Sequence, residues 1–354
     1  MNIVIFVSSL QFGGAQKQAV LDANLLATDH RVFLYAFSGG PLQQQASEKV
    51  EVELIGKDGY LRTALRVRKR IRRNRIDIIH ASLFAPIVIS TLASIFTHTR
   101  VIWHFHSHEY DAPARSNMAF RWLAKWPNVR KVLFVNHELL GHFLYLKFPA
   151  GKTEVQHNHS EISNPGVNRA RHTQDTLHIG YLGRVIGLKR VDYLVGLAEY
   201  FLDSGFSGFK IHIVGDGEAL SGIKGLAVAR QVADHIIFHG FQADVASFYQ
   251  KFDLFVNPSQ EECLSIAMID AGMMALPIVA YDVGGNNEIV VNGKTGYIVR
   301  EKGDFFQKCR LLAQDENIRQ AFGKAAREHC YNLFSKEKHT EELLGIYNEA
   351  LYAH

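Results

Sequence analysis

Two carboxylates, Glu262 and Asp270, stand in a stretch where a short apolar strand gives way to a helix-like run. If that helix starts near Ser265, Glu262 lies in the loop before it and Asp270 lies further along it. Carboxylates at such a junction can accept hydrogen bonds from sugar hydroxyls, and the unpaired amides of the first helical turn can bind a phosphate. The pattern is typical of a site for a nucleotide sugar.

Two cations, Arg184 and Lys189, follow another strand-like run and are separated by a turn at Gly187. Arginine binds phosphate as a planar fork and lysine binds it as a point charge, so the pair suits a pyrophosphate. Ordinary surface charge is the alternative, but the position after a parallel strand favours the phosphate site. At another strand end, Gly240 and Phe241 offer backbone groups that could meet a nucleobase.

The N-terminal half contributes an adjacent glycine pair and alternating histidines. Gly13 and Gly14 would let the backbone approach a ligand at a helix start, although an ordinary tight turn explains them as well. Alternation along a strand would place His104, His106 and His108 on one face, which raises a zinc hypothesis. No further ligands converge there, so we favour one histidine pointing into a cleft from the carboxyl edge of a sheet.

Strand-like and helix-like segments alternate along the whole chain. The strand-like segments are short, β-branched and apolar on both faces, which is typical of parallel strands covered by helices. Two doubly wound α/β domains are therefore expected, joined by a polar linker at Ser160–Asp175. The expected strands are Ile3–Val7, Val32–Phe37, Val50–Leu54, Ile78–His80, Val101–His104, Val132–Val135, His178–Leu182, Lys210–Val214, Ile236–Phe238, Leu254–Val256, Ile278–Ala280 and Tyr297–Val299.

Length and composition agree with this division. A chain of 354 residues fits two domains, and 47% hydrophobic with 21% charged residues is typical of a soluble globular protein. No apolar run is long enough to span a bilayer, and the opening residues predict a strand rather than a signal peptide. Three cysteines without metal-site spacing indicate free thiols, so we expect a cytoplasmic protein.

Charge is divided unevenly between the two halves. The first 172 residues hold 22 Lys and Arg against 12 Asp and Glu, and the remainder holds 17 against 23. The basic half is expected to face an anionic partner. Without a helix-turn-helix or an aromatic RNA-binding motif, nucleic acid is not expected to be that partner.

Eight of the basic residues fall within Leu61–Ile76, which predicts a basic amphipathic helix. Such a helix can lie on anionic lipid, and a solvated helix packed on the sheet is the alternative. The residues expected to form its buried stripe are Leu61, Ala64, Leu65, Val67 and Ile71.

Taken in order, these motifs resemble those of glycosyltransferase family 4. The resemblance implies the GT-B fold, in which two Rossmann-like domains face each other across a cleft. It implies an acceptor-side domain at 1–165, a nucleotide-sugar domain at 166–335, and a C-terminal helix at 336–354 that crosses back. The motifs are Gly13-Gly14, His106, Gly183-Arg184 with Lys189, Val214-Gly215-Asp216-Gly217, Gly240-Phe241, Glu262 with Asp270, and Gly284-Gly285 with Glu288.

The resemblance also implies a role for each site residue, with His106, Glu262, Arg184 and Lys189 as the catalytic set. Arg184 and Lys189 would hold the donor diphosphate and stabilise the leaving group. The remaining implied contacts are Glu262 with the sugar hydroxyls, Asp270 with the ribose, Gly240 and Phe241 with the base, Leu264, Ser265 and Ile266 along the phosphate-binding helix start, His106 near the donor sugar, and Gly14 lining the cleft.

The sequence departs from the family pattern at two places. Asp270 stands where the family usually has a second Glu, and Cys263-Leu264-Ser265 replaces the usual Gly-Phe-Gly. Both changes affect the donor side of the expected site. Neither removes a carboxylate or a phosphate-binding cation.

The expected activity is transfer of a hexosyl unit from a nucleotide sugar, with a UDP-sugar favoured, to a saccharide or lipid-linked saccharide with retention of configuration. No metal cofactor is expected, because protein cations and helix N-termini replace it. Contact with the inner face of the membrane through Leu61–Ile76 is part of this hypothesis. The alternatives are a nucleotide-sugar epimerase of the same fold and a non-catalytic nucleotide-binding subunit.

Overall fold

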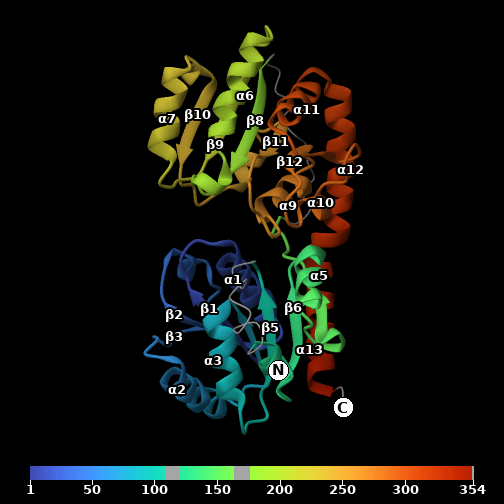
Figure 1. The fold of residues 1–354 in the computed structure, drawn as a ribbon. Helices are drawn as coiled ribbons and strands as arrows, with labels where there is room; N and C mark the ends of the chain where they lie inside the picture. The colour runs from blue at the N-terminus through green and yellow to red at the C-terminus, as the bar shows by residue number, and fades with distance from the viewer. Residues whose placement is uncertain (108–119, 163–175, 353–354) are drawn as a thin grey trace. The chain divides into compact units, whose positions relative to one another are not determined.

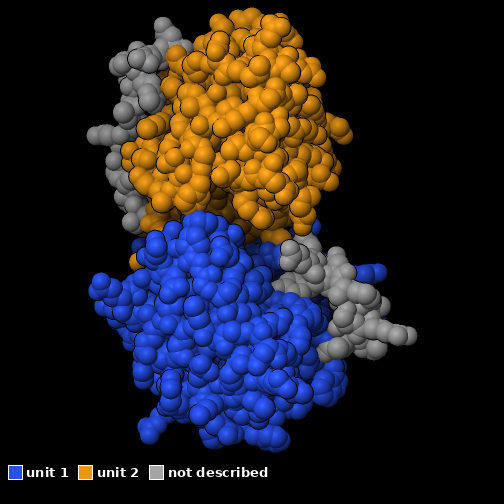
Figure 2. Space-filling model, turned by 90° about the vertical axis from the view of Figure 1, so that its left-hand side faces the viewer, with its two compact units in different colours: residues 1–159, 337–354 blue, residues 160–336 orange. Residues whose placement is uncertain are grey.

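The computed structural model describes residues 1–107, 120–162 and 176–352. It divides the chain into two compact units, the first formed by residues 1–159 with 337–354 and the second by residues 160–336 (Figure 2). The boundary expected at 165/166, and most of the expected linker, lie outside the described residues. The structure places the change of unit at 159/160 and the return at 336/337.

The first unit is built on a seven-stranded parallel sheet in the order β3-β2-β1-β4-β5-β6-β7 (Figure 1). Six of these strands are confirmed predictions. The seventh, β7, was missed because its three residues, Thr153–Val155, are too few to show alternation. The others are β1 (Asn2–Ser9), β2 (Arg31–Ser38), β3 (Val50–Leu54), β4 (Ile78–Ser82), β5 (Arg100–Phe105) and β6 (Val129–Phe134).

Helices from both ends of the chain complete the first unit. The C-terminal helix α13 (Lys336–Tyr352) contributes Leu343, Ile346 and Tyr347 to the same apolar core as β1 and β2. Further helices of this unit are α1 (Gly14–Leu26), α2 (Tyr60–Arg73), α3 (Phe84–Ser94) and α5 (His137–Tyr145).

The second unit has a six-stranded parallel sheet in the order β10-β9-β8-β11-β12-β13, and all six strands were predicted. Its strands are β8 (Leu177–Leu182), β9 (Phe209–Val214), β10 (Ile236–Gly240), β11 (Leu254–Asn257), β12 (Ile278–Tyr281) and β13 (Gly296–Val299). Its helices are α6 (Asp192–Asp203), α7 (Leu220–Ala229), α8 (Ala246–Tyr249), α9 (Ile266–Met273), α10 (Asn286–Ile289), α11 (Lys302–Gln314) and α12 (Glu316–Phe334).

The predicted basic helix is present as α2, but its predicted buried stripe is partly wrong. Ala64, Val67 and Ile71 are buried as expected, whereas Leu61 and Leu65 are 71% and 60% exposed. At roughly 100° per residue, Leu65 lies on the side of the helix opposite the buried residues. Two leucines therefore share the outward face of α2 with its cations.

Two further observations concern the predicted free thiols and the expected absence of a membrane-spanning segment. Cys263, Cys309 and Cys330 are free thiols, as predicted. Within the described part of the chain, none of the helices combines the length and apolar character needed to cross a bilayer.

Candidate functional site

The strand order of the second unit reverses at β8, which lies between β9 and β11. In open parallel sheets, ligands bind outside the carboxyl ends of the strands at such a switch point. The loop after β8 carries Arg184 and Lys189, and the loop after β11 carries Glu262. The topology therefore brings the predicted cations and the first predicted carboxylate to one edge of the sheet.

Lys189 and Glu262 form an ion pair, with Nζ 2.8 Å from Oε1 and about one sixth of each side chain exposed. The same ammonium donates to the Glu261 carbonyl at 3.0 Å. An ammonium has three N–H donors, so one remains for a ligand. The sequence predicted both residues but not their pairing, because 73 residues separate them.

Two polar residues at the end of β11 orient Glu262. Asn257 Nδ2 and Ser259 Oγ donate to its Oε1 at 3.2 and 3.0 Å. Within the described residues, Oε2 receives no hydrogen bond, so it is open to a hydroxyl donor. Sequence reasoning missed both orienting residues, although polar side chains directly after a buried strand were a signal for them.

Arg184 is held by its backbone and exposed at its side chain. Its carbonyl accepts a hydrogen bond from the Tyr181 hydroxyl at 2.9 Å, while its guanidinium makes no hydrogen bond or ion pair within the described chain. Burial, reinforced by the Glu262 charge and opposed by Arg184, raises the pKa of Tyr181 well above its usual range. The hydroxyl therefore stays a neutral donor, and the guanidinium is free to meet an anion.

Glycines allow the neighbouring loops to pack this closely. Gly284 has φ +53°, and a Cβ there would overlap the Glu262 carbonyl oxygen. The next amide, Gly285 N, donates to the Cys263 carbonyl at 2.6 Å. Because L side chains are disfavoured at positive φ, this glycine pair supports the loop that carries Glu262.

The helix start predicted near Ser265 is confirmed, since α9 begins at Ile266 with Ser265 as its N-cap residue. The Ser265 side chain makes no capping hydrogen bond. Leu264 and Ile266 are buried, with 5% and 8% exposure, so they contribute backbone rather than open side-chain surface. The uncapped first turn leaves amide donors for an anion.

Asp270 lies deeper than the sequence suggested. It is only 4% exposed, and its Oδ1 accepts a hydrogen bond from Ser160 Oγ at 2.6 Å. Besides burial, its charge raises the pKa of Tyr249 and of Cys330, the latter to about 12. The second carboxylate is thus part of a buried polar contact with Ser160, a residue 110 positions earlier.

The base-side residues follow β10. Gly240 has φ +66°, and its carbonyl accepts from the Gly215 amide at 2.8 Å. Phe241, the next residue, is 51% exposed. The loops after β9 and β10 are therefore tied together by a backbone hydrogen bond, and the half-exposed ring of Phe241 lies next to Gly240 in the chain.

In the first unit, the corresponding sheet edge carries Gly14 and His106. Gly14 begins α1, and a Cβ there would meet no neighbouring atom. His106 Nε2 lies 3.3 Å from Ser82 Oγ, and its ring centroid lies 4.1 Å from that of His104. The third predicted histidine, His108, lies outside the described residues.

Burial keeps His106 uncharged. Desolvation, followed by the neighbouring His104, lowers the pKa of His106 well below its usual value. A neutral imidazole has one donor and one acceptor nitrogen. Because Nδ1 makes no hydrogen bond within the described chain, it can exchange one with a ligand hydroxyl.

A different trio, Asp22, His159 and His339, has the spacing of a metal site. However, Gln18 Nε2 lies 2.7 Å from both Asp22 Oδ1 and His159 Nδ1, and His339 Nε2 lies 2.8 Å from Asp22 Oδ1. Burial raises the pKa of Asp22, but the charge and hydrogen bond of His339 outweigh it and leave that pKa well below its usual range. The ligand atoms already satisfy one another, so no metal is needed to explain them.

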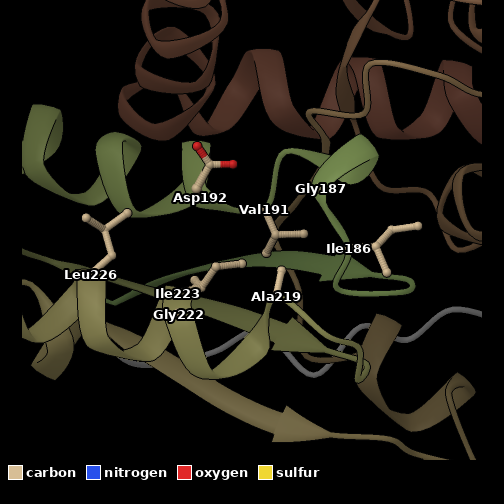
Figure 3. Close-up of a pocket in the computed structure, with 8 residues that line it drawn as sticks. All are labelled: Ile186, Gly187, Val191, Asp192, Ala219, Gly222, Ile223 and Leu226. Carbon is tan, nitrogen blue, oxygen red and sulfur yellow. The ribbon is translucent and has the colours of Figure 1, made fainter.

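A pocket of about 320 Å³ lies beside the Gly187 turn, but it does not include the ion pair (Figure 3). Its lining is almost wholly apolar, and its one charged residue, Asp192, points away from Ala219 and Ile223 in the figure. We assign the phosphate site to the strand ends instead. The lining residues are Ile186, Gly187, Val191, Asp192, Ala219, Gly222, Ile223 and Leu226.

Two family models match this chain, one in each of its two units. Residues 12–160 match the model described as Glycosyltransferase Family 4, and residues 168–329 match the model described as Glycosyl transferases group 1. The chain belongs to glycosyltransferase family 4. This confirms the resemblance inferred from the motifs.

Curated relatives within the family differ in how much of the chain they match. The capsular polysaccharide biosynthesis glycosyltransferase CapM of Staphylococcus aureus is 30% identical over 56% of this chain and 53% of its own length. An Escherichia coli UDP-Gal:alpha-D-GlcNAc-diphosphoundecaprenol alpha-1,3-galactosyltransferase is 20% identical over 94% of this chain and 93% of its own. The chain thus spans about half the length of the first of these relatives.

Solved structures confirm the GT-B fold of two Rossmann-like domains. Anabaena Alr3699/HepE in complex with UDP has a TM-score of 0.84 and 16% identity, covering 98% of this chain and 99% of its own. At that identity the likeness shows the fold alone. The family and the fold therefore have independent support.

Proposed function

We propose that this family member is a retaining glycosyltransferase that moves a hexosyl unit from a UDP-sugar to a saccharide or lipid-linked saccharide during glycan assembly. The observation that carries the proposal is the Lys189–Glu262 ion pair at the switch point of the second unit. In this pair, the cation that we propose to bind phosphate lies beside a carboxylate with an open acceptor oxygen. A nucleotide sugar needs both kinds of partner, with its diphosphate next to its sugar.

The donor contacts follow from the hydrogen bonds that each residue has left. The exposed Arg184 guanidinium and the third N–H of Lys189 bind the diphosphate, joined by the amides at the start of α9. These donors neutralise the charge that develops on the leaving phosphate as the glycosidic bond breaks. We therefore propose that no divalent metal is required.

The sugar, ribose and base have separate partners in this proposal. Glu262 Oε2 accepts from donor sugar hydroxyls, and the Asp270–Ser160 pair contacts the ribose. The exposed ring of Phe241 stacks on the base, beside the Gly240 backbone. In the first unit, neutral His106 hydrogen-bonds the donor sugar and Gly14 leaves room for the substrates.

We further propose that α2 touches the anionic inner face of the cell membrane, which would bring a lipid-linked acceptor to a cytoplasmic enzyme. Leu61 and Leu65 are exposed on its outward face. Arg62 and Lys69 are exposed on the same helix and make no hydrogen bond or ion pair within the described chain. Apolar side chains framed by unpaired cations are suited to an anionic interface.

A donor screen followed by product analysis tests the activity. UDP-, GDP- and ADP-sugars are compared by thermal shift, and the best donors are then incubated with glycan and polyprenyl-linked acceptors. We expect the UDP-sugar to raise the melting temperature and to yield a product with the anomeric configuration of the donor by NMR. Neither binding nor turnover with any donor would contradict the proposal.

Two other outcomes identify the alternatives. An epimerised sugar formed without acceptor indicates an epimerase. Tight UDP binding with transfer only after another chain is added indicates a non-catalytic subunit. In either case the phosphate site is retained and the transferase assignment is lost.

Similar proteins support a UDP-sugar donor and an acceptor used in glycan assembly. HepE has been crystallised with UDP-glucose as well as with UDP. The E. coli relative is named for a UDP-sugar donor and a lipid diphosphate acceptor, and CapM is named for capsular polysaccharide biosynthesis.

A further inference from the structure

Behind His106, the first unit contains an unbroken line of buried polar side chains. Tyr347 Oη on α13 lies 2.7 Å from His80 Nδ1 on β4. His80 Nε2 lies 3.1 Å from His104 Nδ1 on β5, and His104 Nε2 lies 3.2 Å from the Gln156 carbonyl. The three side chains are at most 1% exposed, so water does not supply missing partners.

The direction of every hydrogen bond in this line follows from its carbonyl end. A carbonyl only accepts, so His104 Nε2 must carry a proton and neutral His104 must accept at Nδ1. His80 then donates from Nε2 and accepts at Nδ1, where the Tyr347 hydroxyl donates. With both imidazoles neutral, this one arrangement of protons satisfies all four groups.

Burial favours the same neutral state. Desolvation is the largest effect on both rings, lowering the pKa of His80 to about 4 and that of His104 well below its usual value. The other titratable groups that act on one or both rings are Asp22 on α1, His106 directly after β5, and His339 on α13. Asp22 favours protonation and the histidines oppose it.

His104 is in direct ring contact with His106, the histidine of the candidate site. Its ring packs against that of His106, with 4.1 Å between the ring centroids and an interplanar angle of 44°, while Ser82 Oγ lies 3.3 Å from Nε2 of His106. A His104 ring that flipped or became charged would displace or repel His106. The orientation of His106 therefore depends on the orientation and the charge of His104.

We propose that Tyr347 and His80 are positioning residues for His106, acting by holding His104 uncharged and in one orientation. The inference rests on the proposed function of His106. It gives the C-terminal helix, 267 residues away from His80 in sequence, a part in the site as well as in the core. A buried polar line is costly unless every member is satisfied, and here every member is.

Tyr347→Phe tests the proposal by removing one O–H and keeping the ring. Tyr352→Phe is the matched control, because Tyr352 is on the same helix and 73% exposed. We expect kcat to fall about tenfold in Tyr347→Phe, with little change in KM for the donor. The acid limb of the kcat–pH profile should move to higher pH, because neutral His80 loses the donor at Nδ1.

Histidine nitrogen NMR supplies a readout that needs no turnover. In the wild type, we expect proton signals at Nε2 of His80 and of His104. Tyr347→Phe should shift the Nδ1 signal of His80, which loses its hydrogen-bond donor, and shift the titration of His106, whereas Tyr352→Phe should not. A wild-type protein without transferase activity would refute the proposed function, while the spectra would still test the positioning line.

The overturning result is a folded Tyr347→Phe protein with wild-type histidine spectra and an unchanged titration of His106. An unchanged kcat–pH profile in an active enzyme would also overturn it. If Tyr347→Phe does not fold, His80→Asn in the same NMR experiment replaces it. The expected result is again a changed His106 titration, and an unchanged one counts against the proposal.

Discussion

At the scale of single residues, the partners already present decide what each charged group can still bind. Lys189 has two of its donors occupied by Glu262 and the Glu261 carbonyl, so it offers one N–H to a ligand. Arg184 offers its whole guanidinium, because within the described residues only its backbone carbonyl is hydrogen-bonded. In the proposed donor site the two cations therefore have different roles, with Arg184 as the fork and Lys189 as the link between phosphate and carboxylate.

Lys189→Ala should lower kcat/KM for the donor by about a hundredfold, because it removes a charge-assisted bond to the leaving phosphate and frees Glu262 to repel it. Lys324→Ala is the control, since Lys324 is exposed on α12 and makes no hydrogen bond or ion pair within the described residues. Steady-state kinetics with saturating acceptor measure the effect. A Lys189→Ala rate within twofold of wild type would remove Lys189 from the site.

At the scale of elements, α2 shows how tertiary contacts divide a helix that looks uniformly basic. Arg68 donates to the carbonyls of Leu92 and Ala93 at the end of α3, and Arg70 pairs with Glu53 on β3. These cations fasten the helix to its own unit. Only part of its charge remains for a membrane.

The leucines and the unpaired cations of α2 can be tested separately. Wild type should float with vesicles containing phosphatidylglycerol and remain unbound with phosphatidylcholine alone. Leu61→Glu combined with Leu65→Glu should weaken binding at least tenfold by removing apolar insertion and adding repulsion. Val228→Glu, at an exposed valine of α7, is the matched control.

Arg62→Gln combined with Lys69→Gln should weaken binding without unfolding the helix, at roughly 1 kcal/mol per charge. Raising the salt concentration should reduce wild-type binding in the same direction. Flotation unaffected by either pair of substitutions would contradict the proposed membrane contact.

At the scale of the whole molecule, the first unit should be the acid-labile one. Between pH 6.5 and 4, an unfolded His80 takes up a proton that the folded one, with its pKa of about 4, does not. Stability therefore falls as pH drops through this window, by up to about 3 kcal/mol from His80 alone. His104 and His106 have lowered pKa values and act in the same direction.

Tryptophan fluorescence can isolate this effect, because Trp103, Trp122 and Trp126 all lie in the first unit and are the chain's three tryptophans. We expect the urea midpoint followed by this signal to fall steadily from pH 7 to pH 4.5. His80→Asn should lower the midpoint at pH 7 and make its pH dependence shallower. A midpoint that is flat across this range in wild type would refute the prediction.

The sequence alone predicted the fold class and all but one of the described strands, and it named the residues of the candidate site. Parallel strands buried on both faces are short apolar runs, and the candidate site residues follow directly after such runs. Local sequence patterns are therefore enough to predict the strands and to propose the site residues. The missing strand, β7, was too short to show a pattern. Leu61 and Leu65 were wrongly predicted to be buried. Periodicity shows that a helix has a buried stripe, but it does not show how much of the helix circumference the packed elements cover.

Only the tertiary structure decided which of these residues meet. The Lys189–Glu262 pair, the Ser160–Asp270 contact and the line from Tyr347 through His80 to His104 each join distant parts of the chain. Strand order brings their loops together, and strand order is set by how the whole sheet buries its apolar faces. Local sequence carries no direct record of that arrangement, which is why the site's chemistry could be listed in advance but its hydrogen bonds could not.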